Sequence, residues 1–132
     1  MARFAESGFP PIEDYAFLSD CHTGALVAPD GGIEWLCLPR FDAESVFGAL
    51  LDRGAGRYRI NPRGASDPVG RRYEPGTNTL ETTWATKTGW AVVRDALTIG
   101  PWRERPDDPH VRPPPDEDAD RCLVRVVECV QG

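Results

Sequence analysis

Four acidic residues surround one apolar stretch of this 132-residue chain, and acidic side chains can move protons. They are Asp14, Asp20, Glu34 and Asp42. Two carboxyl groups act as general acid and general base only when their surroundings push their pKa values apart. Local sequence favours structural roles instead: a bend residue at Asp20, a solvated strand residue at Glu34 and a helix cap at Asp42. We therefore predict no catalytic residue in the chain.

The cysteines and histidines offer little for metal binding. The four cysteines (Cys21, Cys37, Cys122 and Cys129) show no C-x-x-C spacing, and there are only two histidines. A structural zinc site would need closely spaced ligands of these types, so we predict no metal and no cofactor. Cys21 and His22 could form a nucleophile and base, but neighbours on an extended chain point to opposite faces. We interpret the cysteines as reduced and mostly buried.

The elements that would position these residues centre on a hairpin at residues 24–38. Leu26 and Val27 lead into the turn Pro29-Asp30-Gly31-Gly32, where proline fixes one dihedral angle and glycine accepts positive φ. Residues 33–38 form the returning strand, with Trp35 at its centre. Pro39 ends that strand because it cannot donate to a sheet ladder.

The rest of the chain predicts an all-β antiparallel β-sandwich with one short helix near residues 43–52. The helix is suggested by apolar i,i+4 pairs and by Asp42 as its cap. Strands are predicted at 12–19, 56–61, 79–86, 90–99 and 122–130, and an N-terminal arm at 1–11. Residues 100–121 are proline-rich and acidic and predict a long loop. Because the strand at 122–130 comes last, we expect an incomplete sandwich whose missing partner strand lies downstream.

Charge and hydropathy exclude two classes of partner. The net charge is -6 with a pI near 4.9, so no basic face is available for nucleic acid. The mean hydropathy is -0.42 and no apolar run approaches the ~20 residues that span a bilayer, so we expect no membrane insertion. The start of the chain lacks the apolar stretch of a signal peptide, and a cytoplasmic location is expected.

Three stretches carry a resemblance to a known family. They are residues 12–16 (Ile-Glu-Asp-Tyr-Ala), 20–27 (Asp-Cys-His-Thr-Gly-Ala-Leu-Val) and 30–42 (Asp-Gly-Gly-Ile-Glu-Trp-Leu-Cys-Leu-Pro-Arg-Phe-Asp). The chain resembles the N-terminal domain of trehalase-like and glucoamylase-like proteins of glycoside hydrolase family 15. The similarity continues through Arg72-Tyr73, residues 75–83, Asp95 and residues 123–128. His22 departs from it, since many members carry arginine there.

The resemblance implies a supersandwich-like domain placed before an (α/α)6 barrel that holds both catalytic glutamates of an inverting α-glucosidase. No segment here has the helical periodicity of such a barrel. By this interpretation the chain is a non-catalytic N-terminal module that packs on and braces the downstream barrel, and meets the α-glucoside (trehalose or malto-oligosaccharide) through the parent enzyme. The alternative is a free-standing carbohydrate-binding or protein-interaction β-sandwich module. The chain alone is not expected to be an active enzyme.

Candidate contact residues follow from these expectations. Asp20, Arg40, Phe41 and Asp42 are candidates for the rim of the substrate pocket or for the barrel interface, because binding residues concentrate on connections that leave buried strands. Arg40 could equally pair with Asp42 or Asp20. Trp35 and Trp102 are candidates for stacking on sugar rings, although tryptophans on strands, such as Trp35 and Trp84, usually fill a core. The strand at 122–130 would expose an edge through which the isolated chain self-associates.

Overall fold

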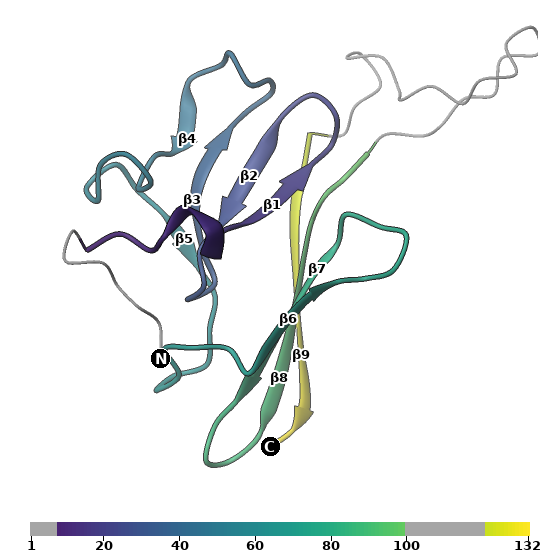
Figure 1. Cartoon of the computed structure of the whole chain (residues 1–132). Helices are drawn as coiled ribbons and strands as arrows, with labels where there is room; N and C mark the ends of the chain where they lie inside the picture. Colours follow the sequence, from purple (N-terminus) through teal and green to yellow (C-terminus); the bar gives the residue numbers. More distant parts are fainter. Residues whose placement is uncertain (1–7, 100–120) are drawn as a thin grey trace, which may run out of the picture.

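The computed structural model describes residues 8–99 and 121–132, and this part of the chain is an antiparallel β-sandwich (Figure 1). The all-β prediction is confirmed. Its elements in chain order are η1 (Ile12–Asp14), β1 (Ala16–Ser19), β2 (Gly24–Val27), β3 (Gly32–Cys37), β4 (Ser45–Phe47), β5 (Tyr58–Arg59), β6 (Gly70–Tyr73), β7 (Leu80–Ala85), β8 (Trp90–Leu97) and β9 (Leu123–Gln131). Sheet A contains β1 to β5, and sheet B contains β6 to β9.

Sheet A is built around the predicted hairpin. Its order is β1-β2-β3-β4, with β5 also pairing with β3. In the β2–β3 turn, the Ala28 N–H donates to the Gly32 carbonyl oxygen at 2.7 Å. Gly31 has φ +80°, and a Cβ there would lie 2.3 Å from the Ile60 carbonyl oxygen. Glycine is therefore required at this turn for both its dihedral angle and its lack of a side chain.

Sheet B has the order β6-β7-β8-β9, and the hairpin predicted over residues 79–99 is β7 and β8. Strand β6 was not predicted, because its residues Gly-Arg-Arg-Tyr have no alternating apolar pattern; pairing with β7 makes it a strand. Arg94 and Asp95 face opposite sides of β8, as alternation requires. Asp95 is buried with Arg125 of β9, while Arg94 pairs with Glu81 and Glu128.

Residues from both sheets form one apolar core. Sheet A supplies Leu18, Ala25, Val27, Ile33 and Leu36, and sheet B supplies Leu80 and Leu97. Trp84 is fully buried, which confirms its predicted place in the core. Polar side chains also join the sheets: Arg71 of β6 donates to the Asp14 and Val27 carbonyl oxygens at 2.7 and 2.9 Å. The sandwich is therefore held by burial and by directional ties across its two layers.

The helix predicted near residues 43–52 is wrong. Strand β4 lies there and pairs with β3, with Phe47 opposite Leu36, and a turn follows at residues 48–52. The supposed apolar stripe is not buried, since Val46 is 50% and Leu51 73% exposed. A short helix is stable only when its apolar face docks, and here pairing with the free side of β3 is available instead.

The structure contradicts the prediction about the burial of the cysteines. All four cysteines are free, but only Cys37 is buried, so the interpretation of mostly buried thiols is wrong. Within residues 8–99 and 121–132, no group of three or more His, Cys, Asp or Glu could hold a metal ion. In the same ranges no helix is long and apolar enough to cross a membrane. Trp102 and most of the segments predicted as the arm (1–11) and the loop (100–121) lie outside the described residues.

Candidate functional site

Two turns meet at one end of sheet A, which is the upper end in Figure 1. One is the β1–β2 turn at residues 20–23, and the other is the segment 38–42 that leaves β3. The Phe41 N–H donates to the His22 carbonyl oxygen at 3.3 Å, which joins the two segments. The Thr23 hydroxyl donates to the Cys37 carbonyl oxygen at 2.5 Å. We call residues 20–23 and 38–42 together the paired turns.

Asp20 builds the paired turns from inside. Its side chain is buried, with 1% of the residue exposed. Its Oδ1 accepts from the backbone N–H groups of His22 at 2.8 Å and Thr23 at 2.7 Å. This is the side-chain-to-backbone bonding typical of aspartate in turns, as the sequence predicted. Asp20 therefore positions the candidate site and does not itself reach its surface.

Arg40, Phe41 and Asp42 are the surface of the paired turns. Arg40 Nε donates to Asp42 Oδ1 at 3.1 Å, with the two side chains 56% and 77% exposed. Phe41 between them is 57% exposed. Asp42 is therefore an ion-pair partner, and its predicted role as a helix cap is wrong. An exposed aromatic ring beside an exposed ion pair can contact a partner that has both polar and apolar groups.

The two stacking candidates do not form a platform in the described part of the chain. Trp35 is half-buried on β3, where it lies opposite Leu26 of β2. Trp102 falls outside the described residues. Trp35 thus has the partly buried environment typical of a strand aromatic that covers a core.

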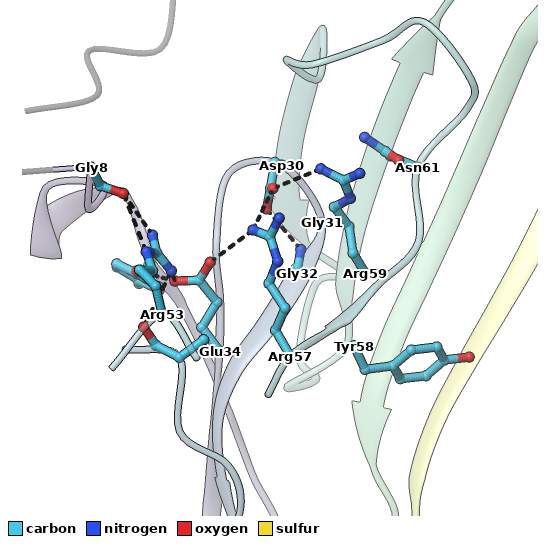
Figure 2. A network of polar contacts seen from close by, with 12 residues as sticks. Gly8, Asp30, Gly31, Gly32, Glu34, Arg53, Arg57, Tyr58, Arg59 and Asn61 are labelled. Carbon is cyan, nitrogen blue, oxygen red and sulfur yellow. Dashed lines mark hydrogen bonds and ion pairs between the residues drawn. The ribbon is translucent and has the colours of Figure 1, made fainter. Parts of the chain in front are cut away.

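Glu34 is the centre of a polar network that the sequence did not reveal (Figure 2). Its side chain is 1% exposed, so its predicted place in solvent is wrong. Glu34 Oε2 lies 2.6 Å from Arg53 Nη1 and accepts from the Tyr15 hydroxyl at 2.5 Å, and Oε1 lies 3.4 Å from Arg57 Nη1. The Leu50 N–H also donates to the Glu34 carbonyl oxygen at 2.9 Å. The loop after β4 therefore packs against β3 at Glu34, a residue that was predicted to be solvated.

The network reaches beyond Glu34 in both directions. Arg53 donates to the Gly8 carbonyl oxygen at 3.1 and 3.2 Å, and its guanidinium carbon lies 4.5 Å from the centre of the Phe9 ring. Asp30 lies 3.3 Å from Arg57 and 3.5 Å from Arg59 (Figure 2). These contacts tie the N-terminal segment, the loop after β4 and strand β5 to β3. The partners in these contacts lie far apart in the sequence. The one local signal was the alternation of Arg57 and Arg59 with apolar residues, which predicted a strand at residues 56–61.

The carboxylates near the hairpin are thus engaged structurally. Two guanidinium groups and a phenol surround Glu34, and an ion pair holds Asp42. Asp20 bonds the backbone of its own turn. Contacts of this kind hold turns and strands in place. The arrangement supports structure and contact.

Tyr15 gives the Glu34 network a measurable pH dependence. Burial, and then the hydrogen bond to Glu34, raise the pKa of Tyr15 well above its usual value. A raised folded-state pKa means that this contribution to stability is complete below pH ~10 and is lost as pH rises toward the folded pKa. We expect the urea midpoint of the wild type to fall more steeply above pH 10 than that of Tyr15→Phe. Tyr58→Phe, which leaves the Tyr15–Glu34 contact in place, should keep the wild-type decline; equal slopes for wild type and Tyr15→Phe would contradict the assignment.

The described residues define a class of protein: an antiparallel β-sandwich module whose paired turns expose an aromatic ring beside an ion pair. The family model described as "Trehalase-like, N-terminal" matches residues 4–97. The chain belongs to this trehalase-like N-terminal family.

Curated relatives extend the comparison. A trehalase of Mycolicibacterium smegmatis is 56% identical over 126 residues, covering 94% of this chain and 19% of that protein. A trehalase of Mycobacterium tuberculosis is also 56% identical over 126 residues, covering 94% of this chain and 18% of that protein. Trehalase 1 of Sulfolobus acidocaldarius is 42% identical over 93 residues, covering 70% of this chain and 16% of that protein. The chain thus spans about a fifth of the length of its first relatives. No solved structure matches it significantly.

Proposed function

We propose that the chain is the non-catalytic N-terminal module of an inverting α-glucoside hydrolase of trehalase or glucoamylase type, and that it packs on and braces a catalytic barrel that follows it. The observation that carries this proposal is the match of 94% of the chain to only 19% of a protein named trehalase. The structural engagement of Asp20, Glu34 and Asp42 supports the non-catalytic role. The names of the relatives support trehalose as the substrate class of the whole enzyme.

Within this function, the paired turns form the contact with the barrel or the rim of its substrate pocket. Arg40, Phe41 and Asp42 are the exposed residues that would meet the barrel, and Asp20 holds their supporting turn in shape. The exposure of Phe41 beside the Arg40–Asp42 pair supports this role, because connections that leave buried strands often carry binding residues.

The test of the non-catalytic role is an assay of the 132-residue chain on trehalose and maltose. We expect no glucose release above the blank, because Asp20, Glu34 and Asp42 are held in turn, network and ion-pair contacts. Hydrolysis that disappears in Asp20→Asn or Asp42→Asn would overturn the proposal. The matched control is Glu13→Gln, which removes an exposed carboxylate away from the paired turns.

A second candidate function is a free-standing module that binds carbohydrate or protein. The exposed Phe41 ring beside the Arg40–Asp42 pair favours it, because sugars present apolar faces to aromatic rings and hydroxyl groups to charged side chains. Calorimetric titration with trehalose, glucose or maltodextrin separates the two functions. Millimolar or tighter binding that is lost in Phe41→Ala would favour the free-standing module.

The cellular location proposed for the protein is cytoplasmic. The free state of all four cysteines supports it, because the cytoplasm keeps thiols reduced.

We also propose that the isolated chain self-associates through the strand at residues 122–130. Light scattering at increasing concentration should show a mass above that of one chain, because the open edge of β9 can accept another strand. A constant monomeric mass at high concentration would count against it.

A further inference from the structure

Strand β9 has one open edge. It is the last strand in the order β6-β7-β8-β9, and within the described residues its only paired neighbour is β8. It is nine residues long, so a long row of backbone donors and acceptors faces away from β8. Exposed edges of this length are pairing sites for another strand.

Some features that normally protect an edge are absent from β9, although its C-terminal end has a register shift opposite Trp90 and Ala91. The segment Leu123–Gln131 contains no proline and no lysine. Its Arg125 side chain is 2% exposed and turned inward to Asp95, at 2.7 Å. Glu128 is engaged by Arg94 at 2.7 Å. Neither charge of the strand is therefore available to repel an incoming strand.

The edge of sheet A shows what a protected edge looks like in this fold. Strand β1 is the outer strand of its sheet, and its Phe17 backbone N–H and carbonyl oxygen both bond the Tyr73 hydroxyl, each at 2.9 Å. Asn78 contacts the backbone of Ser19 on the same strand. Side chains from β6 and the turn after it thus occupy the β1 edge. The β9 edge has no such cover from the described residues.

The faces of β9 are also partly uncovered. Val126 and Val130 are 52% and 59% exposed, and Val127, which points to the other side of the strand, is 55% exposed. The C-terminal half of β9 extends away from sheet A in Figure 1, which explains why both of its faces are open. Valine favours paired, half-buried strands, so this segment has the composition of an interior strand.

We propose that β9 is an interior strand of sheet B in the longer protein, and that a strand of the polypeptide following this chain adds antiparallel to its open edge. The inference rests on the proposed function, which makes the chain part of a longer enzyme. Two observations favour a strand that follows this chain as the partner of the open edge. The first relatives are about five times as long as the matched region, and β8 already pairs with the other side of β9. Successive strands of an antiparallel sheet usually pair as neighbours, and among residues 8–99 and 121–132 nothing pairs with the open edge of β9.

Hydrogen exchange on two proteins tests this pairing. One is the 132-residue chain, and the other is a chimera in which the chain is continued by the part of the M. smegmatis trehalase that follows its matched region. We expect the open-edge amides among residues 123–131 to exchange about tenfold or more slowly in the chimera, because they become hydrogen-bonded. The amides of Phe17 and Ser19 on the capped β1 edge are the internal control and should not change. If the chimera does not fold, the intact M. smegmatis trehalase and its own matched region provide the same comparison.

A pair of variants gives an independent readout. Val126→Lys should leave the denaturant midpoint of the short chain nearly unchanged, since that side chain is half exposed there. It should lower the midpoint of the chimera, where an added strand would place new neighbours beside the lysine. Val69→Lys is the matched control, because Val69 is 58% exposed and lies before β6 at the opposite edge of sheet B. It should have the same small effect in both proteins.

The outcomes separate this inference from the proposed function. A chimera that hydrolyses trehalose while its β9 amides exchange as in the short chain overturns the inference and leaves the function standing. An inactive chimera with protected β9 amides supports the inference and counts against the function. The short chain is measured at a concentration where its mass is that of one chain. In the chimera, protection that rises with concentration, together with a doubled mass, would assign the edge to a second copy and would also overturn the inference.

Discussion

Arg125→Met is expected to lower the free energy of unfolding by about 3–5 kcal/mol, because it leaves a buried carboxylate without its counter-charge. Arg125 and Asp95 are 2% and 1% exposed, and their side chains meet at 2.7 Å. Arg125 also donates to the carbonyl oxygens of Gly31 at 2.7 Å and Tyr58 at 2.8 Å, so one guanidinium joins β9 to sheet A. Since small domains are stable by only about 5–15 kcal/mol, the variant should lose a large part of its stability.

Denaturation with guanidinium chloride, followed by tryptophan fluorescence, measures the free energy of unfolding of the variant. Arg59→Met is the control for removing an arginine, since Arg59 is 47% exposed and lies 3.5 Å from Asp30. Arg59→Met should lower the free energy of unfolding by less than about 1 kcal/mol, because exposed ion pairs contribute little to stability. Adding Asp95→Leu to Arg125→Met should restore part of the stability, because the unpaired buried charge is then gone. An Arg125→Met variant as stable as Arg59→Met would show that Arg125 does not hold the two sheets together.

Glu34→Gln should have the second largest effect, about 1–3 kcal/mol, because the amide keeps the shape of the carboxylate but loses its charge beside two guanidinium groups. The loss should be smaller than for Arg125, since Arg53 and Arg57 are 32% and 41% exposed and water can solvate them. The change also has a local consequence. Arg53 loses the partner that holds it against Gly8 and Phe9, so amides near Gly8 should exchange faster.

Denaturation and hydrogen exchange on the same variant check both parts of this prediction. Glu44→Gln makes the same chemical change at an exposed position and should stay within about 0.5 kcal/mol of the wild type. If Glu34→Gln loses stability without faster exchange near Gly8, the network stabilises β3 but does not anchor the N-terminal segment.

Period-two alternation and turn chemistry were sufficient to predict the strands that matter most. The β2–β3 and β7–β8 hairpins could be placed because proline, glycine and alternating apolar residues are local signals. The helix prediction for residues 43–52 failed because it relied on the same kind of local signal. Its i,i+4 pattern is local, whereas the pairing of Phe47 with Leu36 of β3 depends on the rest of the fold.

In the candidate site and the Glu34 network, too, local contacts could be predicted from the sequence and distant contacts could not. The turn role of Asp20 and the pairing of Arg40 with Asp42 involve neighbours two or three residues apart, so sequence reasoning could find them. The partners of Glu34 lie 19 and 23 residues away, so the local sequence gave no sign of them and the prediction of a solvated side chain was wrong. A charged residue on an inward-facing position of an apolar strand, such as Arg125 among the valines of β9, was the one available sign of a buried ion pair.

The ties between the two sheets also have a consequence for the order of folding. All strands of sheet A lie within residues 16–59, so they can pair with one another as soon as that part of the chain leaves the ribosome. The groups that cap β1 come from Tyr73 and Asn78, and the guanidinium that bonds the Gly31 carbonyl comes from a residue 94 positions later. Contacts of such long sequence separation form slowly. A newly synthesised chain therefore carries sheet A with its β1 edge uncapped until sheet B is made, and this interval is when the protein most needs protection from aggregation.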